Sequence, residues 1–181
     1  GNRVLSVPVK GNGSIDDKEK NIISGIKAWM DQNSRSIYGT RIWKTFGEGP
    51  LADSSNPLSE QGFNEGINYS AQDVRYVVKY AKTSADKDTL FATIMRWPAT
   101  REFKFELLGR ASQYFPGEVE TIELLGHGAV ESSLGVEGLT VTLPETNCNS
   151  IAPVFAITFK AGTDTPMSLA ETLAYFEQSL S

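Results

Sequence analysis

The chain has 181 residues, enough for one domain with a buried core, and carries a formal net charge of −5 with a pI near 5.0. This acidic balance argues against nucleic acid or an anionic membrane surface as a partner. The single cysteine, Cys148, excludes a disulfide within the chain and is expected to be an inert loop thiol. No apolar run approaches the ~20 residues of a membrane helix, and no signal peptide is visible.

The first part of the chain predicts a short strand, a turn and one amphipathic helix. Residues 3–9 are expected to form the strand, and the two glycines in residues 11–13 favour a turn. A helix is predicted over residues 16–33, with Asp16 at its N-cap and Glu19 as the capping-box partner. Four apolar residues share one helical face: Ile22, Ile26, Trp29 and Met30.

The middle of the chain predicts β structure. Glycine and proline are frequent over residues 44–70, which are therefore expected to form a loop. Alternating apolar and polar residues then predict several strands, and residues 89–97, apolar on both faces, suit a central one. The predicted strands are residues 74–80, 89–97, 103–107, 119–125, 138–143 and 153–160. Six or more strands at this spacing favour a mainly β fold, an antiparallel β-sandwich with an N-terminal amphipathic helix and a short C-terminal helix.

The last residues predict that short C-terminal helix. Pro166 suits the first helical position, and Ser168 with Glu171 offers an alternative capping box. The apolar face of the helix is expected to dock on the sandwich, with self-association as the alternative. Its members are Leu169, Leu173, Phe176 and Leu180. The predicted organisation is a segment over residues 1–45, a β-sandwich domain over residues 46–163 and a helical extension over residues 164–181.

Ordered motifs along residues 1 to about 160 carry a family resemblance. They include residues 2–8, Gly11-Asn12-Gly13-Ser14-Ile15-Asp16, Ile37-Tyr38-Gly39-Thr40-Arg41 with Trp43, Gly47-Glu48-Gly49-Pro50, Phe63-Asn64-Glu65, residues 69–75, Arg96-Trp97-Pro98, Glu123-Leu124-Leu125-Gly126 and residues 138–144. Taken in order, they resemble the C-terminal part of the retaining α-L-fucosidases, a family of glycoside hydrolases. Matches at many points in the same order are more specific than any single motif.

The resemblance implies a division of the chain. Residues 1–45 would be a remnant of the catalytic barrel, its last strand and helix, followed by the C-terminal β-sandwich. A complete barrel takes about 250 residues, so none can close from this segment. Three departures from the family pattern weaken the carry-over of barrel functions: Ser6, the run Asn33-Ser34-Arg35-Ser36, and Ile42.

No catalytic group is expected in this chain. Retaining glycosidases use two carboxyl groups about 5–5.5 Å apart, and the resemblance places both upstream of the matched residues. The acids of the glycine-rich loop are expected to be solvated rather than catalytic; they are Glu48, Asp53, Glu60 and Glu65. His127, between two glycines, suits a surface turn, and neither a dyad with Cys148 nor a metal or nucleotide cofactor is indicated.

The aromatic residues offer the remaining candidates for binding. Trp43 and Phe46 lie in the predicted linker and are the candidate carbohydrate or interface contacts, with packing between helix and sandwich as the alternative. Trp29 is expected to pack in the core or at a docking surface because it belongs to the apolar helical face. Trp97, before Pro98, is expected to pack in the core or at a strand end.

Two functional hypotheses follow. The first is the accessory C-terminal sandwich of an α-L-fucosidase that removes terminal α-L-fucose from glycans, inactive as this chain alone. The alternative is a free-standing carbohydrate-binding or protein-interaction module. The expected partners are a catalytic barrel domain or a second copy of the chain, with a fucosylated glycan as candidate ligand. The resemblance suggests a secreted, periplasmic or lysosomal setting, and a truncated chain, a gene remnant and a split enzyme stay open.

Overall fold

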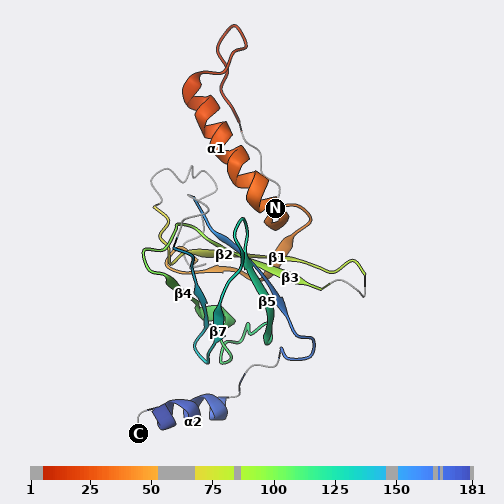
Figure 1. The fold of residues 1–181 in the computed structure, drawn as a ribbon, viewed down its shortest axis with the longest axis vertical. Coiled ribbons are helices and arrows are strands. Elements are labelled where there is room, and N and C mark those ends of the chain that lie inside the picture. The colour runs from red at the N-terminus through yellow and green to blue at the C-terminus, as the bar shows by residue number, and fades with distance from the viewer. Residues whose placement is uncertain are drawn as a thin grey trace.

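Two antiparallel β-sheets packed face to face form the body of the molecule (Figure 1). The computed structural model describes residues 6–52, 68–83, 87–145, 151–164, 167 and 169–179. The core lies between the sheets and draws fully buried side chains from both, such as Tyr76 and Phe155 from one sheet and Phe105 from the other. The prediction of a mainly β sandwich with one helix near each end is therefore confirmed.

The larger sheet has six strands in the order β1-β2-β3-β9-β5-β6. Its members are β1 (Arg41–Glu48), β2 (Val74–Lys79), β3 (Thr89–Ile94), β9 (Val154–Phe159), β5 (Val119–Leu124) and β6 (Gly128–Ala129). The alternation over residues 74–80 correctly predicts β2, whose inward side chains are buried. The two-sided apolar run correctly predicts a central strand at β3, which pairs with β2 and β9.

The smaller sheet has three strands in the order β4-β8-β7. They are β4 (Glu102–Phe105), β8 (Leu139–Thr142) and β7 (Ser132–Leu134), and the 3₁₀ turn η2 (Glu106–Leu108) follows β4 directly. The ring of Phe105 meets that of Phe155 edge-on across the core, at 5.4 Å between centroids. Apolar contacts of this kind join the two sheets.

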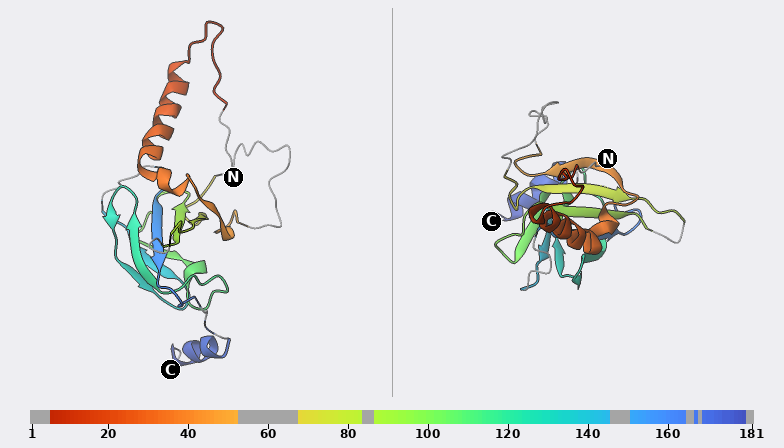
Figure 2. Two further views of the ribbon diagram at one scale, coloured as in Figure 1. Left: turned by 90° about the vertical axis from the view of Figure 1, so that its right-hand side faces the viewer. Right: turned by 90° about the horizontal axis from the view of Figure 1, so that it is seen from above.

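The first helix, α1 (Asp17–Asn33), projects from one end of the sandwich, followed by the 3₁₀ turn η1 (Ser34–Ser36) (Figures 1 and 2). The side chain of Asp16 accepts a hydrogen bond from the Glu19 backbone N–H at 2.9 Å, as the predicted N-cap requires. Only the C-terminal end of α1 touches the sheets. Its apolar face is exposed further out, 48% for Ile22 and 42% for Ile26.

Trp29 anchors α1 to the sandwich. Its indole N–H donates to the carbonyl of Ala152 at 3.0 Å, and its ring packs on a second apolar cluster. The buried members of that cluster are Phe91, Leu125, Val154 and Ala156. The contact explains why β3 and β9 are apolar on both faces, and it confirms the expected docking role of Trp29.

Some expectations are wrong. Residues 6–9 form no strand, and residues 3–5 lie outside the described part of the chain. Residues 44–48, the first part of the expected loop, belong to edge strand β1 (Arg41–Glu48), which a bulge between Ile42 and Gly47 hides from an alternation search. The second helix, α2 (Leu169–Ser179), stands apart from the sandwich, and Leu173 is 54% exposed (Figure 1). Pro166, Ser168 and Cys148 lie outside the described residues.

Candidate functional site

Trp43 and Phe46, the two candidate contact residues from the sequence, lie in different environments in the structure. Trp43 is half-buried and packs against the core, with its ring 5.2 Å from that of Tyr76 and 6.3 Å from that of Tyr114. Phe46, three residues along β1, is 44% exposed. Trp43 therefore closes the open edge of the sandwich, and Phe46 is the aromatic candidate that solvent can reach.

Phe46 belongs to a stack of three side chains. The guanidinium carbon of Arg75, on β2, lies 5.4 Å from the centroid of the Phe46 ring and 5.5 Å from that of Tyr69. A cation over an aromatic face is attracted by the ring quadrupole, so Arg75 holds both rings in place. Gly47 allows this close approach, because a Cβ there would lie 2.2 Å from the carbonyl oxygen of Val74 and 3.0 Å from Nη1 of Arg75.

A turn before β2 fixes the base of this stack. The buried carboxylate of Asp73 accepts hydrogen bonds from the backbone N–H groups of Leu51 and Ser70 and from the Ser70 hydroxyl, each at 2.8 Å. Burial alone would raise the pKa of Asp73, but these hydrogen bonds and the charge of Arg75 lower it below its usual value. The turn therefore ties the chain after β1 to the chain before β2.

Glu48 lies in β1, not in a loop as expected, and is half-buried. Its carboxylate accepts from the backbone N–H groups of Glu106 at 3.2 Å and Leu107 at 2.7 Å, which joins the six-stranded sheet to η2. Burial raises its pKa against the opposing effect of these hydrogen bonds. Burial and the charge of Glu48 also raise the pKa of the buried Tyr76. This geometry indicates a structural tie between the sheets.

The other titratable candidates do not gather into a site in the described part of the chain. His127 is exposed in the turn between β5 and β6, as predicted. Asp53, Glu60 and Glu65 lie outside the described residues. Across residues 6–52, 68–83, 87–145, 151–164, 167 and 169–179, no three His, Cys, Asp or Glu side chains are grouped as a metal site would need. In those same ranges no helix has the length and apolar character needed to span a membrane.

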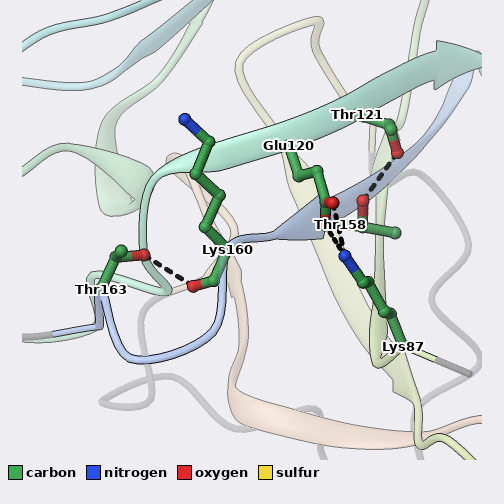
Figure 3. Close-up of polar contacts among 6 residues, drawn as sticks. All are labelled: Lys87, Glu120, Thr121, Thr158, Lys160 and Thr163. Carbon is green, nitrogen blue, oxygen red and sulfur yellow. Dashed lines mark hydrogen bonds and ion pairs between the residues drawn. The ribbon is translucent and has the colours of Figure 1, made fainter. Parts of the chain in front are cut away.

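The outer face of the six-stranded sheet carries a polar groove of ≈ 260 Å³. The hydroxyls of Thr121 and Thr158 share a hydrogen bond of 2.6 Å. Figure 3 shows this pair beside the ion pair of Lys87 with Glu120. Arg35 pairs with Glu123 at the same groove. Because these charges neutralise one another and no aromatic ring lines the groove, its chemistry is that of a solvated sheet face.

Comparison with known proteins decides the family. A model of the alpha-L-fucosidase C-terminal domain matches residues 68–161, which run from the turn before β2 to the end of β9. The chain belongs to this family. Within the fucosidase C-terminal domain, the match covers both sheets except β1, while α1 and α2 lie outside it. A search of curated proteins found no match.

Sequence reasoning missed Tyr69 and Arg75 as members of the exposed stack. Both occur in the motif at residues 69–75. Strand alternation places Arg75 on the outer face of β2, because its neighbours Val74 and Tyr76 point into the core. What no pattern shows is that β1 brings Phe46 to the same place, because the bulge changes the register of β1 against β2.

Proposed function

We propose that this chain is the accessory C-terminal portion of an α-L-fucosidase, whose sandwich supports a catalytic barrel that acts on terminal α-L-fucose of glycans. The family match supports the sandwich part of the proposal. The residues that precede the match, including α1, supply the surface through which the sandwich joins the barrel.

The uncovered face of α1 is the observation that carries the proposal. A helix of 17 residues is about 26 Å long, and in proteins the stability of such a helix comes mostly from the packing of its apolar face. Trp29 secures one end, while Ile22 and Ile26 stay 48% and 42% exposed on the same face. An apolar face left open along a projecting helix suits a partner that packs beside it.

The acids of the described residues support a non-catalytic role. Glu48 and Asp73 hold backbone N–H groups, and a bidentate contact with Arg110 holds Glu118. Glu120 and Glu123 form ion pairs on the sheet face. Asp73 and Glu118 are poor general acids because their partners lower their pKa. Burial raises the pKa of Glu48, but its carboxylate oxygens are occupied by two backbone N–H groups.

Hydrolysis of a chromogenic α-L-fucoside by the purified chain tests the catalytic part. We expect no turnover above buffer, with a characterised α-L-fucosidase as positive control. Turnover by the chain would contradict the proposal, and a D53N/E60Q/E65Q variant would then show whether the acids of the glycine-rich loop supply it.

Self-association, measured by analytical ultracentrifugation, tests the role of α1. With no barrel present, we expect the uncovered face to pair with a second copy at high concentration. The I22E/I26E variant should abolish this pairing. The S24E/A28E variant, with the same spacing on the opposite face, should leave it intact. A chain that stays monomeric at every concentration would contradict the role of α1 as an interaction surface.

A further inference from the structure

The stack of Phe46, Arg75 and Tyr69 combines two features that a carbohydrate site needs. An aromatic ring open to solvent can pack against the apolar C–H face of a pyranose, which removes both surfaces from water. A guanidinium beside that ring can bind a carboxylate through two parallel N–H donors.

The guanidinium of Arg75 is held in place before any ligand arrives. It donates to the carbonyl of Val74 at 2.9 Å and to that of Leu51 at 3.1 Å, and its carbon lies 5.4 Å and 5.5 Å from the centroids of two aromatic rings. These bonds use two of its five N–H donors. A group fixed in this way loses little conformational freedom on binding.

Arg75 forms no ion pair within 4.0 Å among the described residues, although its charge lowers the pKa of the Asp73 carboxylate. Its nearest acid in sequence, Asp73, directs its oxygens to Leu51 and Ser70 instead. The seven ion pairs of the described ranges involve other cations, in a chain whose net charge is −5. A cation that forms no ion pair with the described residues, beside an exposed ring, is complementary to a sugar that carries a negative charge.

We propose that Phe46 and Arg75 bind a uronic acid residue of an acidic glycan. The carboxylate of a uronic acid is attached directly to its pyranose ring, so one sugar can stack on Phe46 while its carboxylate meets Arg75. The Tyr69 ring contacts the same guanidinium, with its centroid 5.5 Å from the guanidinium carbon. The site is independent of α1 and of hydrolysis, so it stands or falls separately from the proposed function.

Saturation-transfer NMR and isothermal titration with methyl β-D-glucuronide test the proposal. Methyl β-D-glucoside, identical except for the carboxylate, is the matched control ligand. We expect saturable, millimolar binding of the glucuronide and at least about tenfold weaker binding of the glucoside, a factor that corresponds to about 1.4 kcal/mol. Equal binding of the two sugars, or no saturable binding of the glucuronide, would overturn the proposal.

Variants locate the site. F46A and R75K should each weaken glucuronide binding about tenfold or more, since one removes the ring and the other the planar fork of donors. I42A, at a 68% exposed position on the same strand, is the control and should bind as wild type does. F46Y should restore binding, which separates loss of the ring from damage to β1. Unchanged affinity in F46A, in a variant with wild-type thermal unfolding, would refute the assignment.

Discussion

Replacing Asp73 with Asn tests whether the turn before β2 is fixed by a buried carboxylate. The native side chain is 1% exposed and accepts three hydrogen bonds, one at Oδ1 from Leu51 and two at Oδ2 from Ser70. Asparagine keeps one acceptor oxygen and presents an N–H₂ group where the other stood. D73N therefore places an amide N–H₂ donor against an N–H donor of the turn, with almost no change in the shape of the side chain.

The size of the effect follows from these contacts. Hydrogen bonds to a charged group contribute about 1.5–3 kcal/mol each, and at least one of the three loses its acceptor whichever way the amide is oriented. The remaining bonds are then made to a neutral amide and are weaker, so we expect a total loss of about 3 kcal/mol. For a chain of this size that loss lowers the melting temperature by about 6–12 °C.

Urea unfolding followed by tryptophan fluorescence measures the loss, with calorimetry as a second probe. E102Q removes an exposed carboxylate from β4 and should stay within about 0.5 kcal/mol of wild type. If D73N also lies within about 1 kcal/mol of wild type, the turn does not depend on this carboxylate, and the reasoning is refuted.

The same pair of proteins predicts a pH dependence. Because hydrogen bonds lower the pKa of Asp73 below its ordinary value of 3.8, its stabilising contribution is fully present above that value. The contribution is lost as the pH falls through the folded-state pKa. The stability difference between wild type and D73N should therefore shrink in acid, and a difference that stays constant would show that the charge is not responsible.

Three further predictions concern the joints of the fold. W29A should lower the free energy of unfolding by about 2 kcal/mol and release α1, seen as lost helical circular dichroism and faster amide exchange; unchanged exchange would contradict its anchoring role. G49A should cost about 3 kcal/mol or more, because φ is +100° and a Cβ would lie 2.2 Å from the carbonyl oxygen of Gln72; G128A, at φ +112° with open space, should cost only about 1 kcal/mol, and equal losses would exclude the clash. E48Q should gain stability relative to wild type as the pH rises from about 4 to about 7. The pKa of Glu48 is raised in the folded state, so its stabilising contribution is present below its ordinary value of 4.5 and lost above the folded-state pKa. If the melting temperatures of E48Q and wild type change in parallel with pH, this explanation is wrong.

Much of the fold is readable in the sequence because the relevant signals are local. The N-cap at Asp16 needs only a side chain three residues before the Glu19 N–H, and the structure places that hydrogen bond as predicted. Strand β2 is half-buried, so its side chains alternate. The long apolar run of β3 shows that both of its faces are covered, although it does not show that Trp29 covers one of them.

The candidate site was predictable only in part. Phe46 stands out as an aromatic residue outside the predicted strands, and the structure leaves it exposed. Trp43 carries the same signal but is half-buried and packs near Tyr76 and Tyr114, rings that are distant in the chain. Arg75 is a candidate only because it contacts the rings of Phe46 and Tyr69, which lie 29 and 6 positions away in the chain. A local sequence pattern does not show these contacts.

The sequence by itself determined the class of the fold, the family and the capped first helix, because periodicity, motif order and capping depend on neighbours within a few residues. Only the tertiary structure decided the strand order, in which β9 lies between β3 and β5. It also decided that Glu48 ties the two sheets together and that α2 stands away from them. These features depend on which distant surfaces meet, and that is set by the packing of the whole chain, not by any one segment.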